Sequence, residues 1–203
     1  MHPFTTVRGA IVTAFALAIV VSLILTGTTN PDALGFHHFQ LDRWLHIVSG
    51  VMWIGLLYYF NVVQVPGLAD AAADKGGPGG AGVTKYIAPR ALWWFRWAAV
   101  ATWITGAYYL LFGYGPEGVL HKAFTLQLGF RTIGVGAWLG TIMLFNVWVF
   151  IWPNQQKILG LKPATDEEKA KARRMAFLAS RTNTMLSLPM LLCMAASAHG
   201  LPF

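Results

Sequence analysis

The residues best suited to chemistry lie on one stripe of an apolar segment, residues 41–66. The segment carries no charge after Arg43. At about 100° per residue, an α-helix would gather six of its side chains in a narrow sector: His46, Gly50, Trp53, Leu57, Asn61 and Gln64. An unpaired polar group in hydrocarbon costs several kcal/mol, so this stripe is predicted to face protein. His46 is therefore a candidate functional residue.

The imidazoles indicate haem as a cofactor. Haem b held between helices needs axial nitrogen ligands from facing spans and small residues where the ring approaches the backbone. His46, with Gly50 and Trp53 on the same stripe, fits one side, and His199 is the expected opposite ligand. Two alternatives stay open: both histidines are interfacial side chains at headgroup level, or copper binds to His37, His38 and His121.

A second group of polar residues is predicted at the opposite end of the same helices. Its members are Asn61, Gln64, Arg96, Asn146, Asn154, Arg181 and Asn183. No Asp or Glu lies within the predicted spans at this depth, so the two arginines lack an evident carboxylate partner. One interpretation is an anion site for a propionate, a lipid phosphate or an acidic heterocycle. The other is a structural network in which the arginines snorkel towards water.

The composition places these residues in a membrane protein. The chain has 203 residues, of which 56% are hydrophobic and only 11% charged, which predicts a single membrane domain over residues 1–203. The net charge of +7 does not indicate nucleic acid, because the cations lie between apolar runs without a basic, aromatic-rich stripe. The single cysteine, Cys193, can form no intrachain disulfide and is interpreted as a packing residue.

Five apolar stretches are each about long enough to cross a bilayer. They are residues 9–26, 41–66, 90–112, 131–152 and 175–198. The first is interpreted as an uncleaved span, since its start is weakly basic and no small-residue cleavage pattern follows. The sequence therefore predicts an all-α, integral-membrane helical bundle.

The intervening segments are polar or rich in glycine. Residues 67–85 are predicted to form a flexible cytoplasmic loop. Residues 165–168, TDEE, match a capping box and are expected to start a short charged helix over residues 165–174. Gly136 and Gly140, at GxxxG spacing, would let a neighbouring helix approach closely.

The distribution of Lys and Arg predicts the orientation. Ten of them precede the first span or lie in the loops between spans two and three and between spans four and five. Only three, Arg43, Lys122 and Arg131, lie on the other side. By the positive-inside rule the N-terminus is cytoplasmic and the C-terminus is periplasmic. The predicted location is the bacterial inner membrane, and most histidines fall on its outer side.

Four segments resemble a known family. WLHIVSGVMWIG, KYIAPRALWWFRW, TIMLFNVWVFIWPNQQ and SRTNTMLSLP are similar to the membrane-spanning N-terminal domain of the bacterial membrane-bound urate oxidase (urate hydroxylase) family. The resemblance implies a membrane domain that oxidises urate and passes electrons to a cytochrome c domain. The residues that it carries over are His46, Asn146, Pro153, Asn154, Gln155 and Asn183.

The chain also departs from that family. No CxxCH motif is present, so an electron acceptor would be another protein. Gly134 and Thr182 stand where the resemblance implies histidines.

Three functional hypotheses follow. The leading one is a membrane haem b protein that transfers electrons, with a substrate or quinone near the inner polar group. The second is a non-catalytic subunit that packs against a larger membrane complex. The third is a urate-oxidising enzyme with a separate cytochrome c partner. All three place the chain among membrane lipids.

Overall fold

The computed structural model describes residue 2 and residues 5–29, 35–115 and 117–202. These ranges contain helices, turns and irregular segments but no β-strand, so the predicted all-α class is confirmed. The chain divides into two compact units, Met1–His38 and Phe39–Phe203. The first unit is built on α1 (Val7–Thr29), which contains the predicted span 9–26 and exposes almost all of its side chains.

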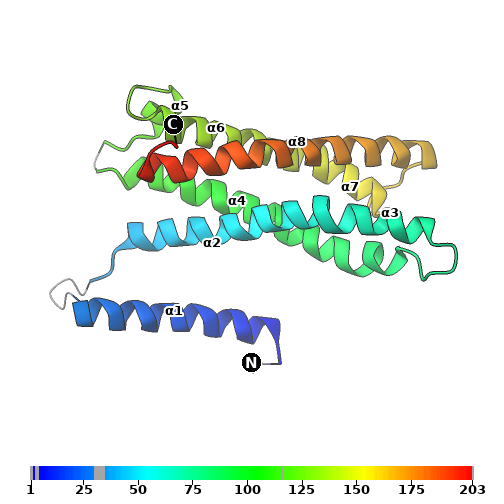
Figure 1. The fold of residues 1–203 in the computed structure, drawn as a ribbon, viewed down its shortest axis with the longest axis horizontal. Helices are drawn as coiled ribbons and strands as arrows, with labels where there is room; N and C mark the ends of the chain where they lie inside the picture. Colours follow the sequence, from blue (N-terminus) through cyan, green and yellow to red (C-terminus); the bar gives the residue numbers. More distant parts are fainter. Residues whose placement is uncertain (1, 3–4, 30–34, 116, 203) are drawn as a thin grey trace. The chain divides into compact units, whose positions relative to one another are not determined.

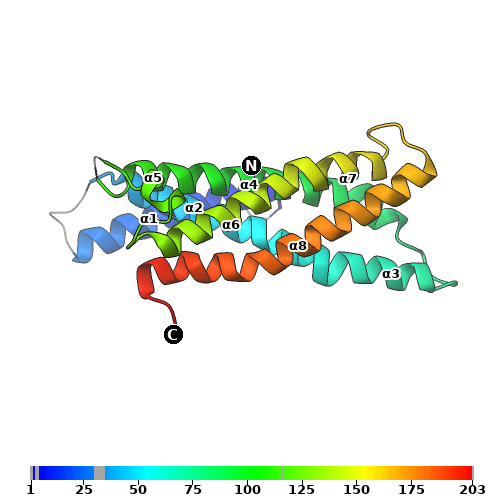
Figure 2. The same ribbon diagram turned by 90° about the horizontal axis from the view of Figure 1, so that it is seen from above.

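The second unit consists of four long helical segments that alternate in direction (Figures 1 and 2). In chain order its elements are α2 (His38–Tyr58), η2 (Tyr59–Gln64), α3 (Val65–Ala73), η3 (Val83–Ile87), α4 (Ala88–Phe112), α5 (Leu120–Phe124), α6 (Arg131–Phe145), η4 (Asn146–Ile151), α7 (Trp152–Ile158) and α8 (Asp166–His199). Large side chains from different segments, including Trp53, Leu57, Phe95, Met143 and Val147, form one buried core. The unit is therefore a helical bundle with a continuous apolar interior.

Three of these elements, η2, η3 and η4, are π-helical. Each ends two residues before a proline: Pro66, Pro89 and Pro153. A proline ring clashes with the carbonyl four residues earlier and removes one backbone donor. In all three cases that carbonyl lies in the π-helical turn, whose wider spacing accommodates the ring. The helices therefore continue past their prolines.

This continuity changes several predicted boundaries. The helix expected to end at residue 66 runs through α3 to Ala73, so the loop predicted over 67–85 is shorter. The separate helices predicted over 165–174 and 175–198 are one helix, α8. No glycine or proline lies between residues 166 and 188, so nothing in this stretch breaks the helix. The residues change from charged to apolar along it, but the helical backbone continues.

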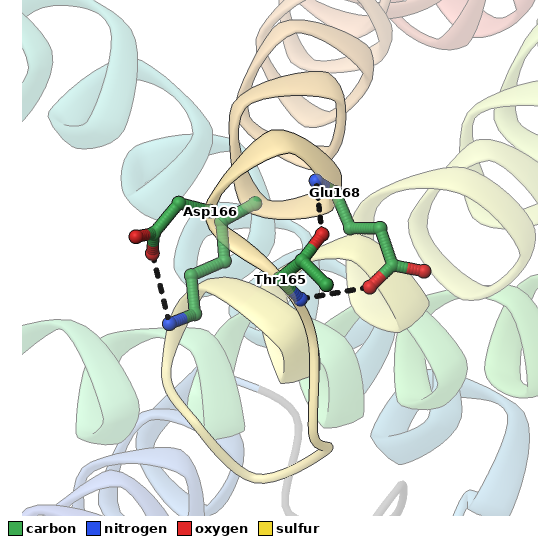
Figure 3. Close-up of polar contacts among 4 residues, drawn as sticks. Thr165, Asp166 and Glu168 are labelled. Atoms are coloured by element: carbon green, nitrogen blue, oxygen red, sulfur yellow. Dashed lines mark hydrogen bonds and ion pairs between the residues drawn. The ribbon is translucent and has the colours of Figure 1, made fainter.

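The predicted capping box at the start of α8 is confirmed (Figure 3). The Glu168 backbone N–H donates to Thr165 Oγ1 over 3.2 Å, and the Thr165 backbone N–H donates to Glu168 Oε2 over 2.8 Å. Lys169 forms an ion pair with Asp166 beside it, at 3.5 Å. These contacts satisfy donors that a helix start leaves unpaired, and they fix where α8 begins.

The bundle contains an internal repeat that links its two helical hairpins. The sequence WIGLLYYFNV starts at Trp53, and WLGTIMLFNV starts 85 residues later at Trp138. Both sequences run into a π-helical turn that carries the asparagine, Asn61 in the first and Asn146 in the second. At the same offset, Arg96 of α4 corresponds to Arg181 of α8. We therefore describe α2–α4 as the first hairpin and α6–α8 as the second.

The two ends of the bundle differ in composition. We call the end where α2 and α6 begin and α4 and α8 finish the histidine end, because His121 and His199 lie there. The opposite end is the basic end and carries Lys75, Lys85 and Lys157. Three helical segments of the described chain are long and apolar enough to cross a membrane: Val7–Thr29, His38–Ala73 and Arg131–Ile158. These findings support a helical membrane protein.

Candidate functional site

The imidazole of His46 faces α4. Its Nδ1 lies 2.8 Å from the Thr102 carbonyl oxygen and 3.2 Å from Thr105 Oγ1. A carbonyl only accepts, so Nδ1 carries the proton and donates it, which leaves a lone pair on Nε2. A Cβ built on Gly106 would lie only 2.8 Å from His46 Cε1, so the missing side chain makes room for the ring. His46 is therefore oriented by protein, as predicted.

His46 and His199 lie at the same level of the bundle but do not contact each other. Tyr58 of α2 and Ser187 of α8 are joined by a 2.9 Å hydrogen bond between their hydroxyls. His46 on α2 and His199 on α8 each lie twelve residues from this contact, towards the histidine end. At helical rise this is about 18 Å. Among the described residues, no hydrogen bond or ring contact joins the two imidazoles, and His199 is exposed.

The other two residues predicted to hold haem lie in the protein interior. A Cβ on Gly50 would meet Thr102 Cγ2 at 3.7 Å, so this glycine allows α4 to come near. Trp53 is 2% exposed and belongs to the apolar core. Gly50 and Trp53 thus pack against protein, and of these residues His46 alone keeps a ring nitrogen, Nε2, that could bind a ligand. The described residues do not form the predicted sandwich between His46 and His199.

The described residues contain no group of three or more His, Cys, Asp or Glu side chains that could hold a metal ion. His37 and His38 belong to the first unit and His121 to the second, so the copper alternative stays a prediction.

Part of the second predicted group is a satisfied structural network. Asn146 Nδ2 donates to Asn183 Oδ1 over 2.9 Å, and Asn183 Nδ2 donates to the Met143 carbonyl over 3.0 Å. Asn61 Nδ2 donates to Ser180 Oγ and to the Leu57 carbonyl. These bonds tie α8 to two of the three π-helical turns, η2 and η4. For these asparagines the structural interpretation holds.

Arg96 is different. Its side chain is 8% exposed, and its Cζ lies 3.4 Å from the ring centroid of Trp152 on α7. No hydrogen-bond acceptor or carboxylate pairs with it in the described chain, and its Nε is fully buried. The indole N–H of neighbouring Trp148 is also buried without a partner. A guanidinium stacked on an indole and lacking an acceptor has unused capacity to bind an anion.

Among the described contacts, none joins Arg96 to the remaining members of the predicted group, Gln64, Asn154 and Arg181. Gln64 Oε1 is buried without a partner. Asn154 donates to the Phe150 carbonyl of its own helix over 2.7 Å. Arg181 is half-buried and stacks on Phe177 one turn earlier in α8, at 5.1 Å. The structure thus separates the predicted group into the asparagine network and Arg96 with its tryptophans.

Sequence reasoning missed several residues that position these side chains. Trp148 and Trp152 are not among the predicted site residues, although Trp152 covers Arg96. Thr102, Thr105 and Gly106, which receive His46, were not singled out. Their spacing of three and four residues is the sequence signal, since such residues share one face of a helix.

The fold defines an all-helical protein with segments suited to crossing a membrane. Residues 119–203 match a protein-family model described as urate oxidase N-terminal. This part of the chain, which contains the second hairpin, is therefore similar to the urate oxidase N-terminal family. The resemblance predicted from the sequence is confirmed over these residues, while that of the earlier motifs stays a prediction. No curated protein and no solved structure gave a significant match.

Proposed function

We propose that this chain is an integral-membrane electron-transfer protein related to the membrane domain of urate oxidase, with His46 at its redox site. The observation that carries the proposal is the imidazole geometry: Nδ1 is held by Thr102 and Thr105, and Nε2 keeps its lone pair. A hydrogen bond of this kind at one ring nitrogen orients metal-binding histidines and raises their basicity. The urate oxidase N-terminal match supports a redox setting.

The proposal includes five membrane-crossing helices in the inner membrane, with a cytoplasmic N-terminus. Three segments meet the length and apolarity requirement. We propose α4 and α8 as the other two, because they run antiparallel to α2 and α6 in the same bundle. The excess of Lys and Arg at the basic end supports placing that end in the cytoplasm.

Haem b is the cofactor that this proposal names. It would supply reversible one-electron chemistry, and His46 would hold it through Nε2. The protein itself fixes the imidazole of His46. Thr102 sets its tautomer, and Gly106 leaves space for the imidazole ring.

The experiment is a haem assay on the full chain purified in mild detergent. Iron and extractable haem per chain are measured for the wild type, His46→Ala and His199→Ala. We expect haem in the wild type and in His199→Ala, and its loss in His46→Ala. An iron-free wild-type preparation, or unchanged haem content in His46→Ala, would refute the role of His46.

A more specific version of this proposal names the substrate and the partner: the chain oxidises urate and passes the electrons to a separate cytochrome c. It is supported only by the family match of residues 119–203. Membranes that contain the chain and an added electron acceptor should then consume urate, and membranes with His46→Ala should not. Absence of urate consumption by haem-loaded protein would remove urate as the substrate while leaving electron transfer in place.

A non-catalytic subunit of a larger membrane complex is the second candidate. The mutually satisfied contacts of Asn61, Asn146 and Asn183 favour it, because they give the bundle a purely structural polar core. This candidate predicts co-purification with other membrane proteins in fixed stoichiometry and no haem. A folded, isolated chain that contains haem would exclude it.

A further inference from the structure

The contact between α4 and the α6–α7 segment carries a positive charge without a counterion. Arg96 is about nine-tenths buried there, with its guanidinium against Trp152. An isolated buried charge is unfavourable, and structures neutralise it by pairing it with an opposite charge. The described chain offers Arg96 no carboxylate. The missing partner is therefore expected to come from another molecule.

An apolar groove lies along the same contact, nearer the histidine end. It has a volume of about 340 Å³ and is lined by Trp103, Thr141, Leu144, Phe145, Trp148 and Val149. Trp148 connects the groove to Arg96, because its ring lies 5.6 Å from that of Trp97, the residue after Arg96. Trp148 also precedes Trp152 by four residues in the same helical segment. The groove and the tryptophan that covers Arg96 are thus one helical turn apart on the same segment, and we treat them together as one candidate surface.

The tryptophans give the depth of this surface in the membrane. Trp97 and Trp148 meet at the level of Arg96, and Trp93 and Trp94 lie one turn nearer the basic end. Tryptophan concentrates where the hydrocarbon meets the headgroups. Trp103, at the other side of the groove, lies about 10 Å further along α4 towards the histidine end. The surface therefore has its charge at headgroup level and its groove in the hydrocarbon.

We propose that this surface binds an anionic phospholipid of the leaflet at the basic end, with its phosphate at Arg96 and one acyl chain in the groove. Charge complementarity selects the anion, since Arg96 has donors and no acceptors. The depth of the tryptophans and the direction of the groove match a molecule with an interfacial head and an inward tail. This site is independent of His46 and of the proposed redox function.

The first experiment measures lipid retention by the full chain. The protein is delipidated in mild detergent and exchanged into bilayer discs of phosphatidylglycerol or of phosphatidylcholine with the same acyl chains. Lipid that stays bound after extraction is counted by native mass spectrometry. We expect the wild type to retain one phosphatidylglycerol per chain, and Arg96→Gln to lower that occupancy about tenfold, because a hydrogen-bonded charge pair is lost.

Arg181→Gln is the matched control, because Arg181 holds the equivalent repeat position but stacks on its own helix. It should retain phosphatidylglycerol as the wild type does. Equal retention by Arg96→Gln and the wild type would overturn the proposal. So would equal retention of the two lipids, or recovery of a quinone or fatty acid in place of a phospholipid.

A second pair of variants tests the groove with Arg96 intact. Val149→Trp places a large ring in the groove, and Val135→Trp adds the same ring to another exposed position of the α6–α7 segment outside it. Val149→Trp should lower phosphatidylglycerol retention several-fold, while Val135→Trp should leave it unchanged. Unchanged retention in Val149→Trp would show that no acyl chain occupies the groove and would overturn the proposed binding mode.

Discussion

The two hairpins share a sequence motif but are held together by different side chains. In the second hairpin, Asn183 of α8 receives a hydrogen bond from Asn146 and donates one to the Met143 carbonyl. The position equivalent to Asn183 in the first hairpin is Ala98, which can make neither bond. There α2 and α4 are joined instead by His46 and Thr102, nearer the histidine end.

This difference separates scaffold from candidate chemistry. The second hairpin is the part matched by the urate oxidase N-terminal family, and its buried asparagines satisfy each other. The first hairpin contains an imidazole with a free Nε2 and a buried arginine without an acceptor. Buried polar groups that the chain does not satisfy are where ligands are expected. The first hairpin thus carries both of these candidate binding groups, while the groove beside Arg96 is lined mostly by the second hairpin.

The largest effect is expected from removing the asparagine contact of the second hairpin. Asn183→Ala leaves the Asn146 side chain without its partner and removes one hydrogen bond to the Met143 carbonyl, which should cost about 2–4 kcal/mol of unfolding free energy. Reversible unfolding in mixed micelles measures this. Thr184→Ala, which removes only a bond to the carbonyl of Ser180 in the same helix, is the control and should cost less than about 1 kcal/mol. Equal losses would contradict the scaffold role.

The next effect concerns the contact that holds His46. Gly106→Ala places a Cβ 2.8 Å from His46 Cε1 and 3.2 Å from Nδ1, so the imidazole must move off Thr102. Overpacking of this kind costs about 1–3 kcal/mol. The same unfolding assay gives the cost, and the NMR shifts of the His46 ring report whether its hydrogen bond is lost. Unchanged shifts would place His46 away from α4.

A smaller effect is expected at a position where both hairpins have a glycine. Gly55 and Gly140 occupy equivalent repeat positions, and nothing lies within 4 Å of a Cβ built on either. Gly55→Ala and Gly140→Ala should each leave stability unchanged or raise it by up to about 1 kcal/mol, because alanine favours the helix. Destabilisation of Gly140→Ala alone would reveal a close contact specific to the second hairpin.

The smallest effect concerns the exposed start of α8. The Thr165 backbone N–H holds the pKa of Glu168 below its ordinary value of 4.5. Because the pKa of Glu168 is lower in the folded state, its carboxylate stabilises the fold fully above pH 4.5. That stabilisation is lost as the pH falls through the pKa of the folded state. Acidification should therefore fray the first turn of α8, seen as a loss of amide-exchange protection at residues 166–169 relative to the intrinsic rate at each pH. Glu168→Gln should show no such pH dependence in this range.

The sequence predicted the helical segments well because long apolar runs leave few alternatives in a membrane. It also predicted the capping box and the inward direction of the His46 stripe, which follow from helical periodicity. It did not predict the π-helical turns at Pro66 and Pro153, because proline usually signals an end to the helix. The same expectation placed the end of the second span at residue 66.

The site was predicted less completely, because it depends on which helices face each other. His46 and His199 lie at the same level of the bundle, but the level of a residue along a helix does not fix the direction of its side chain around that helix. The asparagine network and Arg96 were grouped by depth as well, and only the structure separates them. The repeat of WxGxxxxFNV was visible in the sequence and would have shown that Arg96 and Arg181 are equivalent positions.

The most direct test of the redox account is the difference spectrum between dithionite-reduced and air-oxidised full chain. The account predicts a Soret band and an α band typical of haem b in the wild type, and neither band in His46→Ala. A featureless spectrum from folded wild-type protein expressed with sufficient haem would contradict it.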